Sequence, residues 1–120
     1  MPVRLSAVSL DVGDHACMTA FWSGVLEAEP FDVEDGFASL PLGGGTTLDL
    51  IAVPEPKTVK DRLHLDLRPT EAGTQDQEVA RLLALGAVHA DVGQGDDVSW
   101  VVLADPEGNE FCVLRGQTSA

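Results

Sequence analysis

Four side chains on predicted strands in the middle and at the end of the chain are able to do chemistry. Asp49 and Glu110 supply carboxylates, His64 an imidazole and Cys112 a thiol. Mixed oxygen and imidazole donors suit Zn, Ni, Mn or Fe as divalent ions. Asp49, His64 and Glu110 could therefore form a metal site, with Asp66 or Cys112 nearby. Glu110 is also the candidate catalytic carboxylate.

Each of these residues has a structural alternative, which the sequence leaves open. His64 could hydrogen-bond to Asp66 or Asp49 inside the fold. Asp49 and Glu110 could be solvated or paired with a cation. Cys112 could be a small buried apolar residue, as free cysteines commonly are. The arginines available for such ion pairs are Arg62, Arg68 and Arg115.

The last third of the chain holds the clearest structural signal, a strand, a tight turn and a second strand over residues 99–114. The turn is Asp-Pro-Glu-Gly-Asn at 105–109, in which Pro106 restricts φ and Gly108 and Asn109 tolerate positive φ. Beyond the turn, side chains alternate between the two faces of the strand. One face carries Glu110, Cys112 and Leu114, and the other carries Phe111 and Val113.

The first half predicts one strand, one helix and three further strands. Residues 3–12 alternate as a half-buried strand, and Asp14 is a suitable N-cap for the helix that follows. The helix region ends by Pro30. Strands are predicted at 31–34, 37–42 and 46–53, and the triple glycine 43–45 is expected to be a hairpin turn rather than a phosphate cradle. The apolar stripe of the helix is Met18, Phe21, Trp22, Val25 and Leu26.

The same plan then recurs after a proline-containing linker at 54–57. A strand is predicted at 62–68, and a helix at 71–85 with Gly86 as its C-cap. A strand at 87–92 and a turn at 93–97 lead into the closing hairpin. Residues 116–120 are expected to be a frayed tail.

The chain thus shows β-α-β-β-β twice. Asp49 and Cys112 are 63 residues apart, the separation that also relates Phe37 to Trp100. In the opening strands, Ala7 corresponds to His64. An internal repeat of this kind indicates a repeated architecture.

Composition narrows the class of protein. The 120 residues carry a net charge of −13, which argues against binding to nucleic acid or to anionic membranes. Charged residues make up 22% and apolar residues 44%, a usual balance for a globular domain. No run of 18 apolar residues predicts a membrane span, and no secretory signal is visible. With two cysteines, the default expectation is a reduced, cytoplasmic protein.

The stretch LADPEGNEFCVL at 103–114 resembles the closing hairpin of the vicinal oxygen chelate superfamily, which includes glyoxalase I, extradiol dioxygenases and bleomycin-resistance proteins. The resemblance implies an α+β fold in which two βαβββ modules place curved mixed sheets around a cleft. It predicts a single domain over 1–120, with module one at about 3–53, a linker at 54–61, module two at about 62–115 and a tail at 116–120.

Metal-dependent members of this superfamily bind a divalent ion through the first and last strands of each module. The resemblance places the first-strand positions on Ala7 and His64, and the last-strand positions on Asp49 and Cys112. Ala7 cannot bind a metal, and Cys112 stands where a glutamate is expected. Because Cys112 cannot replace that base, glyoxalase I activity is not supported.

The resemblance therefore predicts a glyoxalase-like protein that acts on or binds a small organic molecule in the cleft between the modules. An enzyme would be a metal-dependent lyase, isomerase or dioxygenase-like member with an incomplete ligand set. The alternative is a non-catalytic protein of the bleomycin-resistance type that sequesters its ligand, for which the negative charge favours a cation. A homodimer is expected. The predicted cleft residues are Ser9, Trp22, Asp49, His64, Asp66, Trp100, Glu110 and Cys112.

Overall fold

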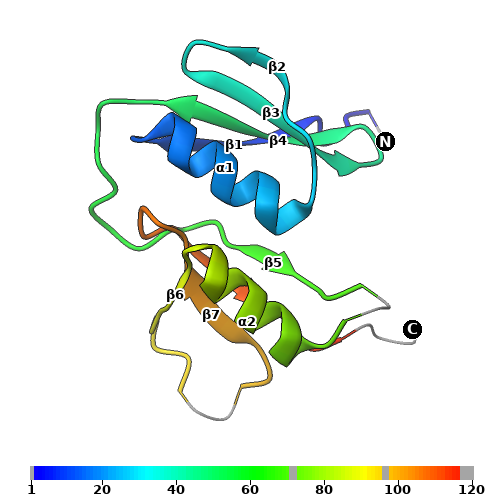
Figure 1. The fold of residues 1–120 in the computed structure, drawn as a ribbon, viewed down its shortest axis with the longest axis vertical. Coiled ribbons are helices and arrows are strands. Elements are labelled where there is room, and N and C mark those ends of the chain that lie inside the picture. The colour runs from blue at the N-terminus through cyan, green and yellow to red at the C-terminus, as the bar shows by residue number, and fades with distance from the viewer. Residues whose placement is uncertain (1, 71–72, 96–97, 117–120) are drawn as a thin grey trace. The chain divides into compact units, whose positions relative to one another are not determined.

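The computed structural model describes residues 2–70, 73–95 and 98–116, and the chain divides into two compact units, Met1–Pro56 and Lys57–Ala120. Each unit combines one helix with one four-stranded sheet (Figure 1). The predicted α+β class is therefore confirmed. The tail at 117–120 and parts of the predicted helix start and turn, 71–72 and 96–97, lie outside the described residues.

The two sheets have the same strand order. In the first unit the order is β1-β4-β3-β2, and in the second it is β5-β8-β7-β6. The first strand of each unit runs parallel to the last, whereas the other neighbours are antiparallel. The elements of the first unit are β1 (Ala7–Val12), α1 (His15–Leu26), β2 (Phe31–Glu34), β3 (Phe37–Gly43) and β4 (Thr46–Ala52). Those of the second are β5 (Leu65–Leu67), α2 (Gln75–Leu85), β6 (Val88–His89), β7 (Val101–Ala104) and β8 (Glu110–Val113).

The register of the strands reproduces the repeat in the sequence. In the first unit Asp49 of β4 lies between Ser9 of β1 and Ser39 of β3. In the second unit Cys112 of β8 occupies the same place, between Asp66 and Val102. Asp49 and Cys112 are therefore equivalent positions, as predicted.

Local side-chain chemistry determines where the helices begin and end. Asp14 accepts a hydrogen bond from the Cys17 backbone at 3.1 Å and caps α1 as predicted. α1 ends at Leu26, before Pro30, because Glu27 adopts a left-handed conformation with φ of 49°. α2 begins at Gln75 rather than at residue 71, since Thr74 and Gln77 form a capping box.

Two strands of the second unit are shorter than predicted. β5 covers three residues of the predicted 62–68, and β6 covers two of the predicted 87–92. After β6, the side chains of Gln94 and Asp91 accept hydrogen bonds from the backbone N–H groups of Val92 and Gly93. Such local bonds compete with pairing to a neighbouring strand. The triple glycine links β3 to β4 with positive φ at all three residues, which confirms the predicted turn.

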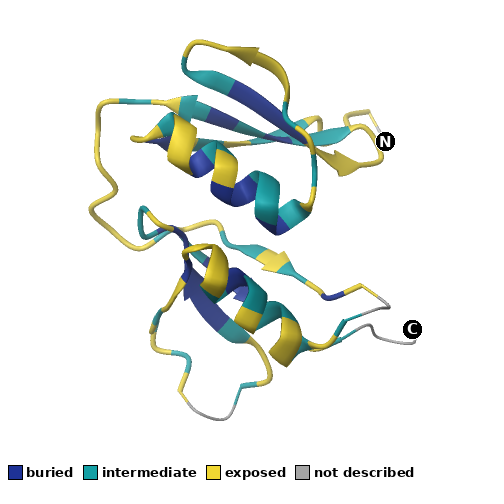
Figure 2. Cartoon of the chain, in the orientation of Figure 1, coloured by how far each residue is buried: buried dark blue, intermediate teal, exposed yellow. Residues whose placement is uncertain are grey.

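The core of the first unit lies between α1 and the strands β3 and β4, against which the helix packs. Figure 2 shows buried residues along α1 and on the central strands. The rings of Phe21 and Trp22 meet edge to face with centroids 5.3 Å apart, and the two residues are 3% and 1% exposed. Among the described residues, no helix is both long and apolar enough for a membrane span.

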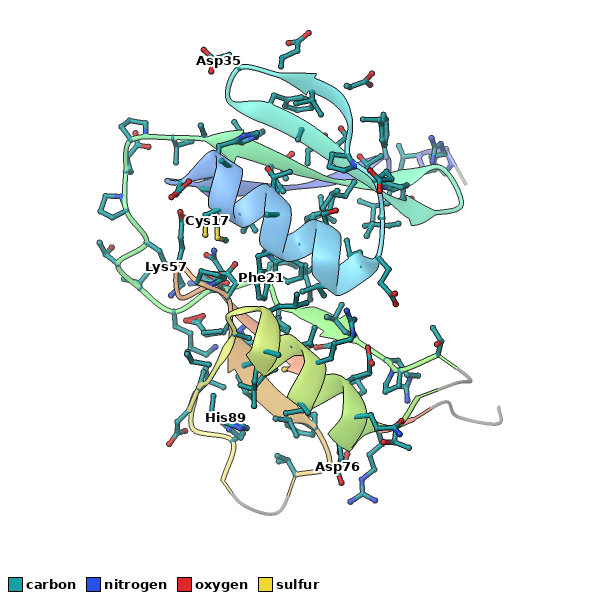
Figure 3. All side chains as sticks on the ribbon, viewed as in Figure 1. Cys17, Phe21, Asp35, Lys57, Asp76 and His89 are labelled. Atoms are coloured by element: carbon teal, nitrogen blue, oxygen red, sulfur yellow. The ribbon has the colours of Figure 1, made fainter. Side chains whose placement is uncertain are left out.

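Phe21 provides a direct test of this core, because its side chain on α1, labelled in Figure 3, is almost fully buried. Phe21→Ala should lower the free energy of unfolding by about 3–5 kcal/mol, the usual result of removing a buried ring. Phe31→Ala is the matched control, since Phe31 is 41% exposed on β2. Urea unfolding measures both changes, and equal losses would contradict the assignment of Phe21 to the core.

Candidate functional site

A cavity of about 270 Å³ lies within the second unit. Its lining combines an imidazole, a carboxylate, a thiol and an indole with one aliphatic side chain. β5 and β8 bring the carboxylate and the thiol together, because Asp66 and Cys112 are register partners on adjacent strands. The lining residues are His64, Asp66, Trp100, Cys112 and Leu114.

Four of the eight predicted cleft residues thus meet in one cavity. The fifth lining residue, Leu114, was not included in that prediction. The alternation along the last strand, which places Leu114 on the same face as Cys112, was the signal that could have identified it.

The thiol of Cys112 is held in its neutral form. Burial raises the pKa of Cys112, and the neighbouring Asp66 carboxylate raises it further through its charge and by accepting a hydrogen bond from the thiol. Cys112 is 7% exposed, so the prediction of a buried cysteine is confirmed. A neutral, hydrogen-bonded thiol is a weak nucleophile and a poor metal ligand.

His64 stands at the entrance to β5, where residues 57–64 form a loop. Its Nε2 atom lies 3.0 Å from the carbonyl oxygen of Asp61 and 3.3 Å from the Lys60 ammonium. The partner of the imidazole is therefore a backbone carbonyl of its own loop, rather than the carboxylate of Asp66 or Asp49 that the sequence suggested.

Glu110 is occupied by interactions with the same loop. Lys57 Nζ donates to its Oε1 atom at 2.7 Å, and the backbone N–H of Asp61 donates to Oε2 at 2.9 Å. Burial alone would raise the pKa of Glu110, but the hydrogen bonds from Lys57 and Asp61 hold it below its usual range. The cation paired with Glu110 is thus a lysine of the predicted linker and not one of the arginines proposed from the sequence.

The pKa of the Asp61 carboxyl group shifts in the direction opposite to that of Glu110. Its pKa is raised, first by burial and then by the nearby negative charge of Glu110. Sequence reasoning missed Lys57, Lys60 and Asp61 because they lie in a stretch without periodic pattern. No local signal shows that this stretch binds to the start of β8.

The predicted site residues of the first unit have structural partners of their own. Asp49 accepts hydrogen bonds from Ser39 at 2.6 Å and from Thr47 at 2.8 Å, both on its Oδ1 atom. Ser9 is its register partner on β1. Trp22 is buried, which confirms its predicted role in core packing and leaves almost no exposed surface for a cleft wall.

The donors predicted for a metal ion do not fit one in the second unit. Both oxygens of the candidate carboxylate, Glu110, are already bound by Lys57 and by the backbone N–H of Asp61. Across residues 2–70, 73–95 and 98–116, no group of three or more histidines, cysteines or acidic residues is arranged to hold a metal.

The Asp66–Cys112 pair predicts a specific pattern of thiol reactivity. In the native protein, iodoacetamide should modify the exposed Cys17 well before Cys112. Asp66→Asn removes the negative charge that keeps the Cys112 thiol protonated, so alkylation of Cys112 should become several-fold faster. Peptide mass spectrometry with time measures both sites, and Cys17 serves as the internal reference. An unchanged rate at Cys112 would mean that Asp66 does not control the thiol.

The Lys57–Glu110 pair predicts pH-dependent stability. A carboxylate whose pKa is lowered by folding stabilises the protein above its unfolded pKa of about 4.3, and this contribution is lost as the pH falls through the folded pKa. Lys57→Met should therefore cost roughly 0.5–1.5 kcal/mol at pH 7 and progressively less below about pH 4.

Thermal melting across this pH range measures the effect of Lys57→Met. The control is Lys60→Met, which makes the same change in charge within the same loop and should change stability by less than about 0.5 kcal/mol. A loss for Lys57→Met that persists unchanged at pH 3 would contradict the assignment to Glu110.

The chain is similar in sequence and in fold to proteins related to glyoxalases. The sequence model of the glyoxalase-like domain matches residues 7–114. No curated protein sequence matches the chain at a significant level. Among solved structures, a glyoxalase/bleomycin resistance protein/dioxygenase family enzyme from Burkholderia phytofirmans PsJN is 25% identical, with a TM-score of 0.69 over 92% of this chain and 97% of that one.

Two fosfomycin resistance proteins share the fold at lower identity. A variant of FosX from Listeria monocytogenes, complexed with Mn(II) and 1S,2S-dihydroxypropylphosphonic acid, is 18% identical with a TM-score of 0.77, over 98% of this chain and 93% of that one. FosX from Mesorhizobium loti is also 18% identical, with a TM-score of 0.73 over 97% and 94%. Since the family model spans both βαβββ units, the chain belongs to the glyoxalase-like domain family of the vicinal oxygen chelate superfamily.

Proposed function

We propose that the protein binds a small organic molecule in the cavity of the second unit and does not act as a glyoxalase I. The observation that carries this proposal is the Asp66–Cys112 pair, which places a neutral thiol at the last-strand position where a metal-dependent relative would carry a glutamate. Glu110, two residues earlier, is bound by Lys57 and Asp61 and cannot take over that role.

The lining of the cavity supports a ligand with an aromatic or aliphatic body and a small polar part. Trp100, 39% exposed, offers a ring face for stacking, and Leu114 adds apolar surface. Asp66 and the overall charge of −13 favour a cationic or hydrogen-bond-donating group over an anion. A volume of about 270 Å³ is just below the usual range of ligand pockets, which restricts the ligand to a compound of low molecular weight.

We further propose that residues 1–120 form one functional domain and that the protein is a cytoplasmic homodimer. Phe31 and Val33 lie on the edge strand β2 and are 41% and 62% exposed. An edge strand with exposed apolar side chains favours pairing with another chain.

The chain has only two tryptophans, which makes binding measurable by fluorescence. In a Trp22→Phe variant, Trp100 is the sole reporter and lies in the cavity lining. A panel of small aromatic and aliphatic compounds with cationic, neutral or anionic groups should include members that quench it saturably. Asp66→Asn should weaken the best cationic binder about tenfold, as expected for the loss of a charged hydrogen bond.

Val88→Ala is the control, because Val88 is exposed in the same unit but does not line the cavity. If the protein only binds its ligand, each compound should be recovered unchanged. Glyoxalase I assays should remain at background with added Ni(II) or Zn(II). Turnover of a bound compound would instead assign an enzyme in which His64 or Asp66 moves a proton. If every compound quenched the Trp100 fluorescence only in linear proportion to its concentration, the proposed binding in the cavity would be wrong.

A further inference from the structure

We infer that Glu110 is a positioning residue that holds His64 in its Nε2–H tautomer, so that the imidazole offers an acceptor nitrogen to the ligand. The first step is the attachment of the loop 57–64 to the sheet. Both oxygens of the Glu110 carboxylate bind this loop, one through the Lys57 ammonium and the other through the Asp61 N–H. The Glu110 side chain is 11% exposed, so the contact is largely shielded from water.

The second step is the rigid placement of Glu110 itself. The turn before β8 is organised by Asp105, which is 2% exposed. Its carboxylate accepts hydrogen bonds from the backbone N–H groups of Glu107 at 3.0 Å and Asn109 at 2.9 Å, and from the Asn109 side chain. Glu110 follows directly as the first residue of β8, so its carboxylate starts from a well-defined backbone position.

Asp61 connects Glu110 to the imidazole of His64. The same residue whose N–H binds Glu110, Asp61, presents its carbonyl oxygen to His64 Nε2 at 3.0 Å. A carbonyl oxygen only accepts hydrogen bonds, whereas the Lys60 ammonium, 3.3 Å from the same nitrogen, only donates. Nε2 cannot satisfy both. The shorter contact requires a proton on Nε2, and Lys60 is exposed and can be hydrated instead.

With the proton on Nε2, Nδ1 is the nitrogen of the neutral ring that carries a lone pair. His64 and Asp66 both line the cavity, so the neutral ring with its single lone-pair nitrogen and the carboxylate make the polar groups of the lining mainly acceptors, while the Cys112 thiol is hydrogen-bonded to Asp66. This step rests on the proposed function and narrows it. The matching ligand carries an N–H or O–H donor, such as an ammonium, amidinium or phenol group.

The tautomer can be measured without any ligand, so its outcome is separate from that of the binding experiment. Protein labelled with ¹⁵N on histidine is recorded by long-range ¹H–¹⁵N correlation at alkaline pH, where imidazole rings are neutral. His64→Gln identifies the His64 signals among those of the three histidines. The native protein should show His64 as a single Nε2–H tautomer. A predominant Nδ1–H form, or a mixture, would overturn the inference.

Variants of the anchor then test the role of Glu110. Glu110→Gln and Lys57→Met break the ion pair but keep an oxygen that can accept from the Asp61 N–H, so the single tautomer should persist in both. Glu110→Ala and Glu110→Val remove that oxygen, and valine also suits a strand. Both should convert His64 to a tautomer mixture and abolish the hydrogen-exchange protection of the Asp61 amide. A single tautomer in every folded variant would refute the positioning role, and the two acceptor-free variants provide separate chances of a folded protein.

Discussion

The parallel pairing of the first and last strands of each unit is the constraint on which the rest of the structure depends. It brings residues 40 or more positions apart into register, Ser9 beside Asp49 in one unit and Asp66 beside Cys112 in the other. Parallel strands cannot be joined by a short hairpin, so a long connection must intervene, and in each unit it consists of a helix and two further strands. The βαβββ plan of each unit is compatible with this pairing because it provides such a connection.

Equivalent positions in the two units have acquired different chemistry. Asp49 is a carboxylate held by two hydroxyl donors, whereas Cys112 is a thiol held by a carboxylate. In both units the polar group at this position is hydrogen-bonded to neighbouring side chains of the same sheet. A metal ion would have to replace these hydrogen bonds, while a neutral or donor-bearing organic ligand in the second unit can leave them intact.

The anchoring of residues 57–64 connects sheet geometry to the cavity. The loop has few apolar side chains to bury, and Val59 and Leu63 are both largely exposed. Its position depends instead on hydrogen bonds to one carboxylate at the start of β8. Through Glu110, the contacts that hold this loop and the position of His64 at the cavity are thus linked.

The sequence by itself determined the repeated architecture, the helix cap at Asp14, the closing hairpin and the common face of Cys112 and Leu114. These features follow from local periodicity and turn chemistry, which act over a few residues. Only the tertiary structure decided the partners of the polar groups: Lys57 rather than an arginine for Glu110, the Asp61 carbonyl for His64, and Ser39 with Thr47 for Asp49. The physical reason is that hydrogen-bond partners depend on register and loop path to within about 1 Å, and alternation along a strand specifies a face but not a neighbour.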